Sequence, residues 1–135
     1  DIRTVLMSVK YTARIMKCDE MTPSGRIYPT NEVKKAIGTY MDSLARLGEM
    51  DGTSDTVNLD RVSHKINSTY VDDDDWWVAE IETLDTPMGS ILSQLLEAGI
   101  KPAISPRSTG GISHLSNWRV VDLSIISIDV TAKAK

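Results

Sequence analysis

The sequence ends in a long run of β-branched and other apolar residues, from Trp118 to Val130. The run contains neither glycine nor proline, and residues of these types favour an extended strand. No other stretch of the chain has so strong a strand signal. A β-sheet is therefore the element that any fold of this sequence has to accommodate.

Three earlier stretches also have the composition of strands. Residues 4–18 are rich in β-branched and apolar types, which predicts a strand or a bent pair of strands. Apolar and polar residues alternate from Val62 to Tyr70, the period of a half-buried strand. The pattern resumes at residues 76–84 after the aspartates of 72–75, so we predict a hairpin with an acidic, solvated turn.

Two segments show helical spacing. Thr30 is expected to cap the first, whose apolar residues continue as far as Leu47, with Gly48 as the stop. The second is expected to begin at or just before Pro87 and to end at Gly99. Each helix is predicted to bury one apolar face.

The order of elements is strand, helix, hairpin, helix, strand, which predicts a single domain over residues 1–135. Its class is α+β, with a mostly antiparallel sheet or barrel flanked by two or more helices. The polar segments 19–30 and 49–60 are expected to be loops. Because the chain has no phenylalanine, its core must be built from Ile, Leu, Val, Met and a few Trp and Tyr residues.

Composition argues against several classes of function. The net charge of −4 and the absence of a basic cluster argue against a nucleic-acid partner. No apolar run is long enough to span a membrane, and Cys18 is the only cysteine, so we expect a soluble, unexported protein without disulfides. Two separated histidines and one cysteine form no metal motif, the run Asp72–Asp75 lacks calcium-loop spacing, and no cofactor motif is present.

The stretch Ala98–Ile112 is the best candidate for a functional site. A helix is expected to end there, a strand to present Ser105, and a glycine-rich loop to bend around that serine. Arg107 lies two residues further on. The backbone N–H groups of Gly110 and Gly111 could approach a ligand closely, which is what an oxyanion hole requires.

A nucleophilic serine needs a neighbouring base to take its proton, and the chain has only two histidines. His64 is in phase with the apolar residues Val62 and Ile66, so a core or sheet-face histidine is the simpler interpretation, and His64 is a weak candidate base. His114 lies in a polar stretch and is interpreted as a surface residue.

Several short pieces of the sequence lie in the order known from one protein family. These are Gly25–Pro29 followed by an amphipathic helix, Leu47–Met50, the pair Trp76–Trp77, Ile104–Arg107, and Trp118–Val130. On these pieces the chain resembles the prohead core proteases of tailed bacteriophages, the serine peptidases of capsid maturation whose fold is similar to herpesvirus assemblin. The resemblance covers most of residues 5–130 and implies an assemblin-like fold.

The resemblance also assigns residues. It places Ser105 at the family's nucleophile and Arg107 at the arginine of its Ser-Ser-Arg-Gly loop. The family's catalytic histidine follows Leu-Gly-Glu-Leu-Asn, and here that place is taken by Gly52. Pro106 and Ser108 replace the residues that flank the arginine. Loss of the base is expected to remove most of the rate enhancement, because triad members act as a unit.

Two hypotheses follow, and a third is weaker. In the favoured one, the chain is a proteolytically inactive phage virion or head-assembly protein, a capsid-associated structural subunit. In the second, it is an active maturation protease that cleaves scaffold and capsid proteins, with His64 as the recruited base. Both imply phage capsid or scaffold proteins as partners, a homo-oligomer or larger assembly, and a location in the virion or the host cytoplasm. The third is a binding domain unrelated to phage.

Overall fold

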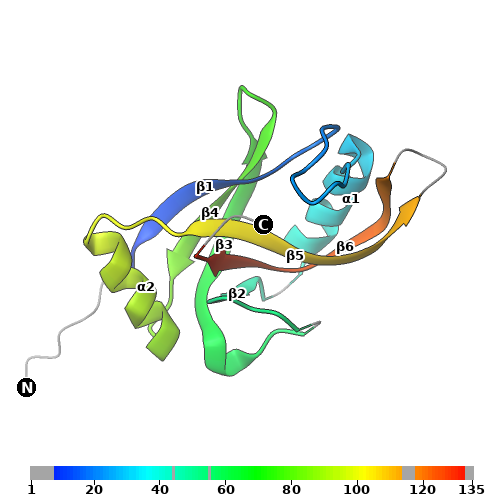
Figure 1. Ribbon diagram of the computed structural model, residues 1–135. Coiled ribbons are helices and arrows are strands. Elements are labelled where there is room, and N and C mark those ends of the chain that lie inside the picture. Colours follow the sequence, from blue (N-terminus) through cyan, green and yellow to red (C-terminus); the bar gives the residue numbers. More distant parts are fainter. Residues whose placement is uncertain (1–7, 44, 55, 114–117, 133–135) are drawn as a thin grey trace, which may run out of the picture.

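The fold is built from two antiparallel sheets and two helices, seen in a computed structural model that describes residues 8–43, 45–54, 56–113 and 118–132 (Figure 1). The elements are β1 (Lys10–Lys17), α1 (Thr30–Met41), β2 (Leu47–Glu49), a short 3₁₀ turn (Leu59–Arg61), β3 (Val62–Val71), β4 (Trp76–Thr83), α2 (Pro87–Glu97), β5 (Ala103–Ser113) and β6 (Arg119–Thr131). The predicted α+β class is confirmed.

The larger sheet has the strand order β1-β4-β3-β2, and all its pairs are antiparallel. Its centre is the predicted hairpin of β3 and β4, in which Ile66 faces Ile81 and Tyr70 faces Val78. Both isoleucines are almost fully buried, at 1% and 0% exposure. The predicted alternation is correct only in part, because Ser63 is also fully buried and Tyr70 is 47% exposed. The pairing register shifts between Ile66 and Ser68, so the end of β3 no longer follows the core face.

The smaller sheet consists of β5 and β6, which form a long curved hairpin across the larger sheet (Figure 1). The two sheets meet where β2 passes beside β6: Met50 forms a parallel bridge to Val130, and the Asp51 N–H donates to the Val130 carbonyl at 2.7 Å. At the opposite edge of the larger sheet, β1 lies close to β5. The arrangement is thus a partly closed barrel.

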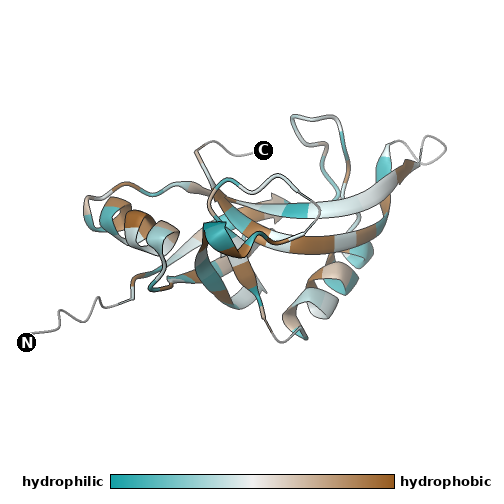
Figure 2. Ribbon diagram, turned by 90° about the horizontal axis from the view of Figure 1, so that it is seen from below, coloured by the Kyte–Doolittle hydropathy of each residue, from teal (hydrophilic) through white to brown (hydrophobic). Residues whose placement is uncertain are grey.

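The helices lie at opposite ends of the molecule (Figures 1 and 2). Helix α1 packs on β6 through a stripe that includes Val33 and Ile37, and α2 packs on β3 and β4. The predicted start of α2 is confirmed, because the Thr86 hydroxyl accepts from the Gly89 N–H at 2.9 Å. Gly99 follows with a φ of 81°, the left-handed conformation that ends helices.

The prediction for α1 is wrong at both ends. Pro29, rather than Thr30, is the N-cap residue, and the Thr30 N–H and hydroxyl donate to Asp19 instead. The helix ends at Met41 and does not continue to Leu47. Arg46 explains the early end, because its guanidinium donates to the Met41 and Ser43 carbonyls and to Ile66 on β3. These bonds turn the chain into β2.

Two further local predictions are also wrong. Glu49, expected at the start of a loop, ends strand β2 and is 1% exposed. Gly110 and Gly111, expected in a loop around Ser105, lie within β5, where Gly111 pairs with Val121. A glycine pair is compatible with a strand where another backbone comes close, and a Cβ on Gly110 would lie 3.0 Å from the Val121 carbonyl.

The acidic turn carries an ion pair that the sequence did not predict. Arg14 on β1 donates to Asp72 at 2.9 Å and to Asp74 at 2.7 Å, and its guanidinium lies over the Trp76 ring. The backbone N–H of Trp76, which donates to Asp72, is the main reason why the pKa of Asp72 lies below its usual value, and the ion pair with Arg14 lowers this pKa further. The described residues contain no cluster of side chains suited to a metal ion.

Burial within α2 gives a stability prediction. Leu92 is fully buried, whereas its neighbour Ile91 is 45% exposed. We expect Leu92→Ala to lower the free energy of unfolding by about 2–5 kcal/mol, since the cavity adds to the lost transfer energy. Urea denaturation would measure the loss, with Ile91→Ala as the matched control in the same helix. Equal losses in the two variants would contradict this packing.

No helix in the described part of the chain is long and apolar enough to cross a membrane.

Cys18 is half-buried, and burial raises the pKa of its thiol, which makes the reactive thiolate rarer.

Candidate functional site

Ser105 lies on β5 opposite Asp129 of β6 and is 7% exposed. It borders two hollows. One is a groove of about 470 Å³ between β5, β1 and the loop after β1, with Met16, Met21 and Tyr28 among its lining. The other is a pocket of about 300 Å³ on the side of Gly52. Ser105 therefore lines both the groove and the pocket and lies between them.

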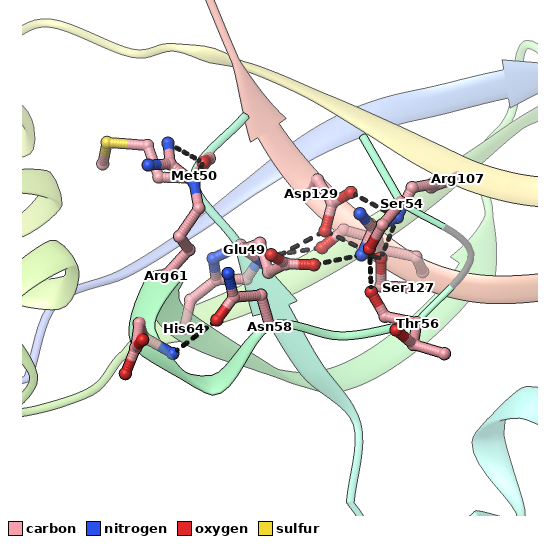
Figure 3. A network of polar contacts seen from close by, with 12 residues as sticks. Glu49, Met50, Ser54, Thr56, Asn58, Arg61, His64, Arg107, Ser127 and Asp129 are labelled. Carbon is pink, nitrogen blue, oxygen red and sulfur yellow. Dashed lines mark hydrogen bonds and ion pairs between the residues drawn. The ribbon is translucent and has the colours of Figure 1, made fainter. Parts of the chain in front are cut away.

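Behind this wall is a buried ion cluster centred on Arg107. Its guanidinium donates to Glu49 of β2 and to the Ser127 hydroxyl, and it lies 3.3 Å from Asp129 of β6 (Figure 3). The exposed fractions of the Glu49 and Asp129 side chains are 2% each. One cation is thus shared by two buried carboxylates, which would be costly to bury without it.

Further hydrogen bonds fix the orientation of the cluster. Asp129 Oδ1 accepts from the Glu49 N–H at 3.0 Å and from the Ser127 hydroxyl at 2.8 Å. Glu49, Ser127 and Asp129 were not predicted as site residues. The sequence offered one signal for this cluster, which is Asp129 between two apolar residues of the strongest strand. A charged side chain that is buried requires a partner.

His64 is completely buried on β3, and both of its ring nitrogens form hydrogen bonds. Nε2 lies 2.7 Å from the Ile128 carbonyl, which can only accept, so Nε2 carries the hydrogen. Nδ1 of the neutral ring then accepts from the Ser63 hydroxyl at 2.7 Å. This confirms the interpretation of His64 as a core histidine. His114 lies outside the described residues.

Burial of His64 predicts a pH dependence of stability. Desolvation lowers its pKa below the ordinary 6.5, so the unfolded chain binds a proton more readily than the folded one. The contribution of the neutral His64 ring to stability is therefore fully present above about pH 6.5, the pKa in the unfolded chain, and is lost as the pH falls from there towards the lower pKa of the folded protein. We expect a slope of at most about 1.4 kcal/mol per pH unit. Urea titrations from pH 7.5 to 5 would show the slope, and His64→Gln should flatten it.

Two glycines shape the surroundings of these groups. A Cβ on Gly48 would lie 1.9 Å from His64 Nε2, so only glycine lets the imidazole reach the Ile128 carbonyl. A Cβ on Gly52 would lie 2.5 Å from Arg107 Nη1 and 3.0 Å from Asp129 Oδ2. The guanidinium therefore occupies the space into which a side chain at position 52 would extend.

Pro106 affects the backbone beside Ser105. Its partner on β6 is Ile128, whose carbonyl is turned towards His64 and away from β5. Because bonded and unbonded pairs alternate along antiparallel strands, the Pro106 nitrogen faces the free edge of β5. Proline has no N–H, so this edge lacks a donor next to the serine.

These positions can be set beside known proteins. No protein-family model matches the chain, and no curated protein matches it in sequence. The fold, however, matches a solved structure, that of the bacteriophage T4 capsid assembly protease, gp21. The two align with a TM-score of 0.80 over 92% of this chain and 82% of that chain, at 15% sequence identity. This chain has a prohead-protease-like fold. The family resemblance in the sequence is thereby confirmed at the level of fold.

Within the prohead-protease-like fold, the resemblance gave Ser105 the nucleophile's place and Gly52 the histidine's place. Both residues line the same 300 Å³ pocket. The described residues offer no imidazole among the lining of either hollow beside the serine. The site thus combines a serine, a buried ion cluster and a pocket.

Proposed function

We propose that this chain is a bacteriophage head-assembly protein that keeps a protease-like fold but does not hydrolyse peptides, and that it acts as a capsid-associated structural subunit. The neighbour of known structure is a capsid assembly protease, which supports a role in the same process. The resemblance places Ser105 at the family's nucleophile and Gly52, which has no side chain, at the family's catalytic histidine.

The observation that carries the proposal is the engagement of His64. A general base must have a free lone pair within hydrogen-bond reach of the serine hydroxyl. The Nδ1 lone pair of His64 already accepts from Ser63, and Nε2 holds its hydrogen against the Ile128 carbonyl. The ring would have to break both buried bonds to serve Ser105.

The backbone supports the same conclusion. An oxyanion hole needs N–H donors that converge beside the nucleophile. Pro106 has no N–H, and Gly110 and Gly111 lie in the β5 strand rather than around Ser105. Arg107 is the nearby cation, and it is directed into the cluster with Glu49.

The test is incubation of the purified protein with phage scaffold and capsid proteins, beside Ser105→Ala. We expect no cleavage by either protein and stable, stoichiometric incorporation of both into assembled particles. Cleavage that disappears in Ser105→Ala would overturn the proposal in favour of an active maturation protease. Absence of any association with capsid or scaffold proteins would overturn the structural role.

A further inference from the structure

Helix α2 has more apolar surface than its contacts with the larger sheet cover. Leu92 is fully buried, and Leu96 also packs against the core. Ile91, beside Leu92, is 45% exposed, and Leu95 is half-buried. Figure 2 shows hydrophobic segments along α2, at the end of the molecule away from α1. The helix therefore has an apolar flank that the described residues leave partly uncovered.

The residues of this flank have the spacing of a helix that packs on another helix. Four apolar residues follow one another at intervals of three, four and three positions, and they are Met88, Ile91, Leu95 and Ala98. Side chains with this spacing form one stripe along a helix, the a and d positions of a heptad. The stripe lies beside the buried face that holds Leu92, so a second helix could pack there without displacing the core.

The stripe is complementary to a second copy of itself. In a pair related by a two-fold axis the helices run antiparallel across the axis, and each contact occurs twice. With the axis level with Ser93, Ile91 of each copy faces Leu95 of the other. In the same register the large side chain of Met88 faces the small side chain of Ala98. Every residue of the stripe then meets an apolar residue.

The charges at the two ends of α2 favour the same arrangement. Asp85 lies just before the helix and Lys101 just after it, and both are exposed. Neither forms an ion pair with another described residue. The antiparallel register brings Asp85 of each copy beside Lys101 of the other, so opposite charges meet at both ends. A parallel pair would bring like charges together at both ends.

We infer that α2 is a homodimerisation surface, on which a second copy of this chain packs its own α2 in the antiparallel direction. Burial of the stripe drives the association. The end charges set the orientation more than the affinity. Because the stripe spans only about three turns, the interface is small and the dimer forms reversibly. The inference does not rest on the proposed function.

Sedimentation equilibrium of the purified protein tests the interface. We expect the weight-average mass to rise with concentration from that of one chain to that of two. Ile91→Gln puts a polar group at the centre of the stripe and should weaken the dimer at least tenfold. The matched control is Val71→Gln, because Val71 is similarly exposed, at 48%, but lies at the end of β3 beside the acidic turn.

The control variant should dimerise as the native protein does, and circular dichroism shows whether both variants are folded. A mass that stays at one chain at every concentration would overturn the inference. A dimer that tolerates Ile91→Gln as well as Val71→Gln would also overturn it, because the interface would then lie elsewhere.

Exchange of the end charges tests the antiparallel register. Asp85→Lys and Lys101→Asp each place like charges at both contacts, and each should weaken the homodimer by about fivefold at low ionic strength. A mixture of the two variants should dimerise again, because each contact then joins a lysine to an aspartate. A mixture no more dimeric than either variant alone would overturn the register. None of these results affects the cleavage and assembly experiment, so the two proposals fail separately.

Discussion

Arg107→Met is expected to lower the free energy of unfolding by about 3–5 kcal/mol, because it leaves Glu49 and Asp129 as buried, uncompensated carboxylates. Methionine keeps much of the length of the side chain, so the loss reports the charge more than the volume. Urea unfolding at neutral pH measures it directly.

Arg14→Met is the matched control. Arg14 also pairs with two carboxylates, Asp72 and Asp74, but the exposed fraction of its side chain is 48%, against 12% for Arg107. Solvent screens exposed pairs, so we expect a change well below that of Arg107→Met. Similar losses in the two variants would contradict the claim that Arg107 compensates two buried carboxylates.

Gly48→Ala is expected to cost roughly 3 kcal/mol, the sum of local overpacking and a lost buried hydrogen bond. The new methyl group would lie 1.9 Å from His64 Nε2 and 2.4 Å from the Ile128 carbonyl, so the imidazole must leave its place. Thermal or urea unfolding would measure the loss.

The control for this variant is Gly38→Ala in α1, where an added Cβ has no neighbour within 4 Å. It should stabilise the protein by up to about 1 kcal/mol, because alanine has the higher helix propensity. If Gly48→Ala were as well tolerated as Gly38→Ala, the close approach of His64 to the β6 backbone would be refuted.

Local patterns predicted much of this fold correctly. The alternation from Val62 to Tyr70 identified β3 and the burial of His64, and the start of α2 followed from Thr86 and Pro87. Such features depend on neighbours in the sequence, so a single chain is enough to find them. The family resemblance then led to the correct fold despite 15% identity with the T4 protease.

The errors share a physical cause. Leu47 continues the helical spacing of α1, yet bonds from Arg46 to Met41 and to Ile66 turn the chain into β2. Glu49 was assigned to a loop because the segment 49–60 is polar, whereas its burial depends on Arg107, which is distant in sequence. Propensity describes one segment at a time, and these residues are placed by contacts between segments.

The proposed function requires that Ser105 has no base that can activate it. The most direct measurement is reaction with a fluorophosphonate, which labels activated serines and needs no knowledge of a protein substrate. Intact mass spectrometry, with Ser105→Ala and an active serine protease as controls, should show that this protein remains unmodified while the protease is labelled. A stoichiometric adduct on Ser105 that is absent from Ser105→Ala would contradict the claim.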